Sequence, residues 1–194
     1  RDDDRIVPLS YRPEIARQLG ADLFVSIHAD SAGTRENVSG ASIYTLSDEA
    51  SSEAAARFAA RENDADRLNG ITLDGQSAAV SAILVGLSQQ RTQEDALELA
   101  SLVLREGERK LAFVPQPKRA AGLAVLRAPD VPSVLFESGF VTNLDDRARL
   151  TTSEGRAQYA SVLARAIRVY FARRSDAGAG PAGAPDGGGG RSGE

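Results

Sequence analysis

The sequence predicts an α/β fold in which a mostly parallel sheet is flanked by helices on both faces. Short apolar runs at residues 23–27 and 133–136 have the length and composition of strands that are buried on both faces. Amphipathic helical segments lie between these runs and after them. The chain has 194 residues, enough for one domain with a substantial core. We therefore expect one folded domain over residues 1–174 and a disordered tail rich in glycine, alanine and proline over residues 175–194.

The order of the elements follows from apolar spacing, cap residues and glycine or proline breaks. Ser10 is suited to begin a short helix that Gly20 ends, and Thr92 with Asp95 resembles a capping box. The predicted elements are a helix at 10–20, strands at 23–28 and 40–46, helices at 48–68, 80–87 and 92–111, strands at 122–126 and 133–137, and a helix at 153–173.

Composition excludes several functional classes. The formal net charge is −4 with both signs interspersed, which argues against a nucleic-acid partner. No apolar run approaches the roughly 20 residues of a membrane span. The absence of cysteine removes thiolate nucleophiles and cysteine-ligated zinc sites. Because the chain has no methionine and opens at Arg1, we expect it to be a processed protein or part of a longer one.

Two of the apolar strands end on residues able to do metal chemistry. His28, the only histidine, ends the first strand, and Glu137 ends the strand that begins at Ser133. In open α/β sheets ligands bind beyond the carboxyl ends of the strands, so the two side chains are expected to face one cleft. Each side chain could instead be a core residue that is held by a hydrogen bond or an ion pair. A glutamate after three apolar residues is nevertheless unfavourable to bury unless it is paired, ligated or catalytic, which favours a hydrolytic zinc site.

Four blocks of the sequence match a known family in order. They are Arg-x-x-Asp-x-x-Val-x-Leu-x-x-Arg at 1–12, and the segments 20–30, 39–44 and 132–143. Together they resemble the zinc-dependent N-acetylmuramoyl-L-alanine amidases of the cell-division type (amidase type 3). The resemblance implies a zinc (Zn2+) cofactor, peptidoglycan as substrate and a periplasmic location. It also implies cleavage of the amide between N-acetylmuramic acid and the L-alanine of the stem peptide.

The resemblance assigns roles to both candidate residues. It implies that His28 is a zinc ligand and that Glu137 is the catalytic carboxylate, which moves a proton from water to the leaving nitrogen. Two further ligands of the family, a histidine and a glutamate, precede the block that starts at Arg1. We expect those ligands and the first strand to lie upstream, and the present chain to bind zinc weakly and to be inactive.

The alanine-rich helix at 48–68 carries a further candidate. Glu62 continues the stripe formed by Ala54 and Phe58, so it faces the body of the protein. Some family members carry a long insertion whose helix covers the zinc cleft, and residues 48–90 resemble that insertion. The resemblance implies that Glu62 reaches the metal and that a LytM-type activator displaces the helix. The alternative is a solvated acidic face that includes Asp64 and Asp66.

Two other functions stay open at this stage. One is a non-catalytic wall-binding or regulatory module that keeps the fold without a complete metal site. The other is a metal-free hydrolase that uses Glu137 and a second carboxylate. A histidine and a glutamate upstream would favour the amidase, and their absence would favour the binding module.

Overall fold

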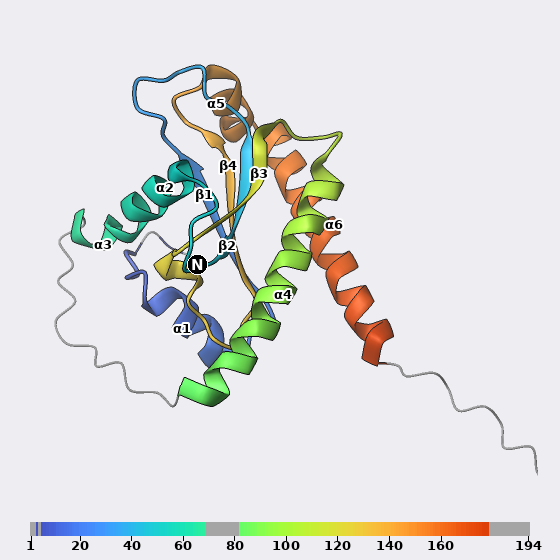
Figure 1. The fold of residues 1–194 in the computed structure, drawn as a ribbon. Helices are drawn as coiled ribbons and strands as arrows, with labels where there is room; N and C mark the ends of the chain where they lie inside the picture. The colour runs from blue at the N-terminus through green and yellow to red at the C-terminus, as the bar shows by residue number, and fades with distance from the viewer. Residues whose placement is uncertain (1–2, 4, 69–81, 179–194) are drawn as a thin grey trace, which may run out of the picture.

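The computed structural model describes residues 3, 5–68 and 82–178, which form one sheet with helices on both sides (Figure 1). The strands are β1 (Phe24–Asp30), β2 (Ala41–Leu46), β3 (Phe113–Ala121) and β4 (Ser133–Phe140). Their order in the sheet is β1-β4-β2-β3. β1 is parallel to β4 and β2 is parallel to β3, whereas β2 and β4 are antiparallel. The expected mostly parallel α/β sheet is confirmed, with one antiparallel pairing at its centre.

Two long helices cover one face of the sheet. They are α4 (Ala82–Gly107) and α6 (Ser153–Gly178), which lie side by side in Figure 1. Because strand side chains alternate between faces, Ile43, Val134 and Phe136 all point toward these helices. Their buried partners include Leu99 and Val162. Within the described part of the chain, no helix is both long and apolar enough to cross a membrane.

The opposite face of the sheet is covered by α2 (Glu53–Asn63). The side-chain oxygen of Ser52 accepts a hydrogen bond from the amide of Ala55 and so caps the helix. The ring of Phe58 stacks on Tyr44 of β2, with centroids 4.4 Å apart. The smaller elements are α1 (Tyr11–Gln18), α3 (Ala65–Leu68), α5 (Leu144–Thr151) and the 3₁₀ turn η1 (Ala124–Leu126).

The third strand lies earlier than the sequence predicts. The apolar run at 122–126 is not a strand, and most of it forms the 3₁₀ turn η1, whose Val125 and Leu126 are buried on the α2 side of the sheet. β3 instead contains Pro115 and Pro117. Proline cannot donate to a strand ladder, but β3 is an edge strand of the sheet and tolerates it.

Two helix boundaries also differ from the expectation. The helices predicted at 80–87 and 92–111 form the single helix α4 from Ala82 to Gly107, so the capping-box pattern at Thr92 does not start a helix. α6 continues to Gly178, past the expected start of the tail at residue 175. Residues 179–194 of the expected tail, and residues 69–81 of the expected insertion, lie outside the described residues.

Candidate metal and hydrolytic site

Strand register places His28 beside Glu137. The two residues are direct partners in the parallel pairing of β1 and β4, and Glu137 is also opposite Ser42 of β2. Side chains at the same level of neighbouring strands point to the same face, which here is the face that α2 covers. His28 Nδ1 lies 3.7 Å from Glu137 Oε1. The structure therefore brings the two candidates together. The expectation that they end their strands is wrong, because β1 continues to Asp30 and β4 continues to Phe140.

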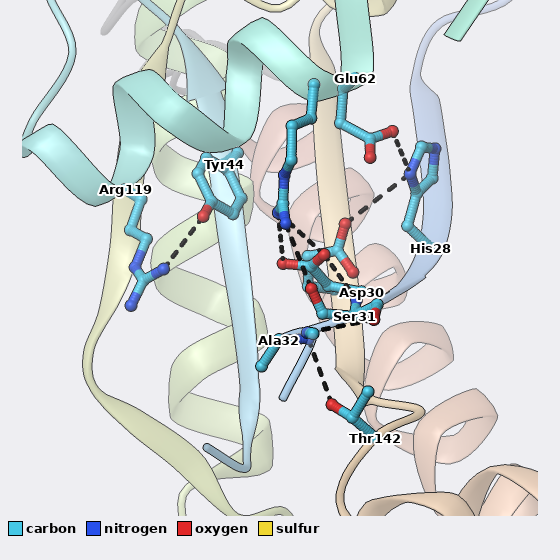
Figure 2. Close-up of polar contacts among 11 residues, drawn as sticks. His28, Asp30, Ser31, Ala32, Tyr44, Glu62, Arg119 and Thr142 are labelled. Carbon is cyan, nitrogen blue, oxygen red and sulfur yellow. Dashed lines mark hydrogen bonds and ion pairs between the residues drawn. The ribbon is translucent and has the colours of Figure 1, made fainter. Parts of the chain in front are cut away.

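His28 has a polar atom close to each ring nitrogen. Its Nε2 is 3.0 Å from the hydroxyl oxygen of Ser26. Its Nδ1 is 3.0 Å from Glu62 Oε2, as Figure 2 shows. Ser26 is two residues earlier on β1, so it shares the face of His28. The imidazole is thus held in one orientation, with Nδ1 toward two carboxylates. That orientation suits a ligand nitrogen that points at a cation.

Glu137 is buried without a hydrogen-bond partner among the described residues. Its residue is 2% exposed, and neither carboxylate oxygen has a hydrogen-bond partner among the described residues. Burial raises the pKa of Glu137 to about 9, and the nearby carboxylates of Asp30 and Glu62 act in the same direction. Buried polar groups are normally satisfied, so an orphaned carboxylate in this position indicates a missing cation or a chemical role.

Glu62 reaches the site from the helix above it. Its side chain is 25% exposed and meets His28 Nδ1 from the C-terminal part of α2 (Figure 2). The neighbouring acids behave differently: Asp64 is exposed and pairs with Arg67, whereas Asp66 is buried and accepts a hydrogen bond from the amide of Leu9. The acidic stretch is therefore not a uniform solvated face, and Glu62 is the member that points into the site.

Two further residues of the site, Asp30 and Arg61, were not predicted from the sequence. Asp30 follows His28 by two positions on β1, and Arg61 of α2 donates to both of its carboxylate oxygens at 3.0 and 3.1 Å. Arg61 also donates to the backbone oxygen of Ser31. The period of two along a strand could have indicated Asp30. Nothing in the local sequence could have indicated its pairing with a helix some 30 residues later.

The described residues offer donor atoms that suit a zinc ion, but not a complete ligand set. His28 offers a nitrogen, Glu62 and Glu137 offer carboxylates, and the unpartnered oxygens of Glu137 suit a nearby cation. A catalytic zinc normally takes three protein ligands and a water. Over residues 5–68 and 82–178, however, no three histidine, aspartate or glutamate side chains are grouped closely enough to hold a metal ion alone. A complete zinc site would need ligands in addition to these.

The fold and the paired His28 and Glu137 define an α/β domain with a candidate hydrolytic site. A family model described as N-acetylmuramoyl-L-alanine amidase matches residues 1–169. The chain therefore belongs to the N-acetylmuramoyl-L-alanine amidase family, which confirms the resemblance found in the sequence.

Relatives with assigned names agree with this membership. The chain is 36% identical over 172 residues to N-acetylmuramoyl-L-alanine amidase AmiA of Escherichia coli K12, covering 88% of this chain and 59% of that protein. It is 34% identical to AmiC of Neisseria meningitidis, covering 88% of this chain and 41% of that protein. The chain thus spans about half the length of the curated relatives it matches.

Solved structures share the fold. N-acetylmuramoyl-L-alanine amidase AmiC2 of Nostoc punctiforme aligns with a TM-score of 0.56 and 26% identity, covering 89% of this chain and 71% of that chain. Ami1 of Mycobacterium smegmatis aligns with a TM-score of 0.59 and 19% identity, covering 89% of this chain and 65% of that chain. At 19% identity the second match bears on the fold alone.

Proposed function

We propose that this chain carries the hydrolytic site of a peptidoglycan amidase that cleaves the amide between N-acetylmuramic acid and the L-alanine of the stem peptide. The observation that carries the proposal is the buried, unpartnered Glu137 beside His28 in a chain of the amidase family. Residues 1–174 form the proposed catalytic domain, and residues 48–90 form its proposed regulatory insertion. A periplasmic location and a role in cell division belong to the same proposal.

In the proposed mechanism His28 is one of three zinc ligands. The other two are the histidine and glutamate that the family resemblance puts before Arg1. A zinc ion bound there supplies a Lewis acid for the scissile carbonyl. Glu137 takes the proton of the attacking water and returns it to the leaving nitrogen. Glu137 would need to be ionised to accept the proton, and a zinc ion bound in the site would lower the pKa of Glu137 from its raised value of about 9.

A defined substrate tests this function. The complete protein carrying Glu62→Ala, which removes the carboxylate that α2 places beside His28, is loaded with zinc and incubated with a muramyl peptide, and the products are identified by mass spectrometry. We expect a free saccharide and a peptide that begins with L-alanine, and we expect His28→Ala to remove both bound zinc and product. Zinc-loaded protein that sediments with peptidoglycan but releases no peptide would contradict the proposal and support the non-catalytic wall-binding module.

We further propose that α2 holds the site closed. Glu62 occupies the space next to Nδ1 of His28, the nitrogen that also faces Glu137. The helix is fixed on both sides of Glu62: Arg61 binds Asp30, and the side chain of Asn63 donates to Gly122 O and accepts from the amide of Ala124. A LytM-type activator would have to bind the displaced helix more tightly than the docked one to open the site.

Two matched variants of the complete protein test this closure. Glu62→Ala removes the carboxylate that contacts His28, and it should raise amidase activity measured without an activator. Asp64→Ala removes an exposed carboxylate from the end of the same helix and should leave that activity unchanged. Equal activity in both folded variants would mean that Glu62 does not hold the site closed.

A further inference from the structure

A groove of about 680 Å³ adjoins the candidate site. One wall is formed by α2, the helix proposed to close the site, and the other walls are formed by β2, by β3 and by the loop between β1 and β2, which do not belong to that helix. The groove begins at Asp30, two residues beyond His28 on the same strand and the same face of the sheet. A molecule that reacts beside His28 could therefore extend directly into it.

The charge of the groove is opposite to that of the protein. The formal net charge of the chain is −4, yet four arginines and only one acidic residue line the groove. The acidic residue, Asp30, is already bound by two nitrogen–oxygen contacts from Arg61. Arg57 pairs with Glu53 along α2. Within the described ranges, Arg35 and Arg119 form no ion pair with a carboxylate, so two cations remain available to a ligand.

Arg119 is held ready for such a ligand. Its Nη1 donates to the hydroxyl of Tyr44 at 3.0 Å, and its Nε donates to the backbone oxygen of Gln116 at 2.9 Å. Figure 2 shows Arg119 on β3 and Tyr44 on β2 beneath the same helix that carries Glu62. These two contacts fix the guanidinium plane through Nε and Nη1. A guanidinium that is fixed in advance loses little freedom when it binds a planar carboxylate.

We propose that this groove binds the carboxylates of an acidic peptide, and that Arg35 and Arg119 are its anion-binding residues. The inference rests on the proposed amidase function, because the acidic peptide is then the stem peptide on the nitrogen side of the cleaved bond. The saccharide side of that bond carries uncharged hydroxyl groups, which interact less strongly with unpaired cations. The groove thus assigns a direction to the substrate, with the peptide running from His28 past Asp30 toward Arg119.

Direct binding tests the proposal without requiring turnover. The probes are a muramyl tetrapeptide with free carboxylates and the same peptide with every carboxylate amidated, titrated by calorimetry into the protein carrying Glu62→Ala, which serves as the parent for this comparison. The groove variant is Arg35→Gln with Arg119→Gln. The control variant is Arg109→Gln with Arg168→Gln, which removes the same charge from exposed positions outside the groove. Arg119→Lys keeps the charge, and Tyr44→Phe removes the hydroxyl contact while keeping the guanidinium.

The groove variant should bind the acidic peptide at least tenfold more weakly, and the control variant should bind it as the parent does. Arg119→Lys keeps the charge but not the fixed planar guanidinium, so it should lose part of the affinity, and amidation of the peptide should weaken binding to the parent at least tenfold, as in the groove variant. Equal losses in the groove and control variants, or tight binding of the amidated peptide, would overturn the proposal. So would a loss in Tyr44→Phe as large as in the groove variant.

The outcome separates this proposal from the proposed function. A complete protein that binds the acidic peptide through the groove but releases no peptide would refute the amidase and keep the anion-binding groove. A protein that cleaves the substrate with the same KM in the parent and the groove variant would keep the amidase and refute the groove.

Discussion

Asp146 and Glu137 are both buried carboxylates near the carboxyl end of β4, but their surroundings are opposite. Asp146 is 1% exposed, and its Oδ2 accepts hydrogen bonds from the amides of Gly40 and Phe140 while its Oδ1 pairs with Arg149. Glu137 is 2% exposed and has no hydrogen-bond partner among the described residues. One carboxylate is fully satisfied by the fold and the other is not.

The difference separates an acid that builds the structure from one that is available for chemistry. The partners of Asp146 come from the start of β2, the end of β4 and the helix α5, so the carboxylate joins three elements. Gly139 permits this approach, because a Cβ there would lie 2.8 Å from the Asp146 carboxyl group. Among the described residues, Glu137 links no two elements by hydrogen bonds. Burying such a carboxylate lowers the stability of the fold, which is typical of residues that serve a function.

Removing Asp146 should have the largest effect on stability. Asp146→Ala leaves two buried amides and a guanidinium without their acceptor, and the free energy of unfolding should fall by about 3–5 kcal/mol. Asp146→Asn keeps the shape and should lose less. The matched control is Asp145→Ala, an exposed neighbour on α5, with a loss below about 1 kcal/mol by urea denaturation. If Asp146→Ala lowered the free energy of unfolding no more than Asp145→Ala does, the structural role assigned to Asp146 would be wrong.

Removing the charge of Glu137 should have an effect that depends on pH. The pKa of Glu137 is raised from 4.5 to about 9, so between these values the unfolded chain ionises while the folded, metal-free protein keeps the proton. The contribution of Glu137 to the free energy of unfolding therefore falls as pH rises through this range. The stability of Glu137→Gln relative to the parent should increase by up to about 1.4 kcal/mol per pH unit in this range, and should not change with pH below it.

The groups around Glu137 define the control for that measurement. His28, Glu62, Asp30 and Arg61 all lie close enough to influence it. Comparing the parent with Glu137→Gln at each pH cancels their own titration to first order. A stability difference that stays constant from pH 5 to pH 8 would show that the carboxylate is already ionised in the folded protein.

The smallest effect is expected at the surface contact that fixes α2. Arg61 is 53% exposed where it binds Asp30, and exposed ion pairs typically contribute less than about 1 kcal/mol. Arg61→Gln should therefore lower the free energy of unfolding by less than about 1 kcal/mol in urea. A loss above about 2 kcal/mol would mean that this pair supports the fold rather than only positioning the helix.

The sequence was sufficient for the features that depend on local patterns. Apolar runs located the strands of His28 and Glu137. The two side chains lie together because β1 and β4 pair in parallel at that level, although both strands continue beyond these residues.

Of the predicted stripe on α2, Phe58 and Glu62 face the body as expected. Ala54 of that stripe is exposed, and Ala55 is buried instead. Side-chain periodicity was enough to place Glu62 but not every residue of the stripe.

Features that depend on pairing over long distances could not be read in this way. The run at 122–126 has strand composition, but the ladder with β2 forms at 118–121 instead, where Arg119 faces Tyr44. Neither Arg119 nor Arg61 carries a local signal, since their partners lie 75 and 31 residues away in the chain. The groove and the contact that fixes α2 both arise from such pairs.

We infer that Glu137 lacks hydrogen-bond partners because it transfers the proton of the attacking water. The most direct test is the rate of stem-peptide release by the complete, zinc-loaded protein carrying Glu137→Gln, with zinc content measured on the same sample. We expect kcat to fall by about 10²–10⁴-fold while zinc stays bound, because the substitution removes the proton acceptor but does not remove a zinc ligand. A kcat within tenfold of the parent in a folded, zinc-loaded variant would contradict it.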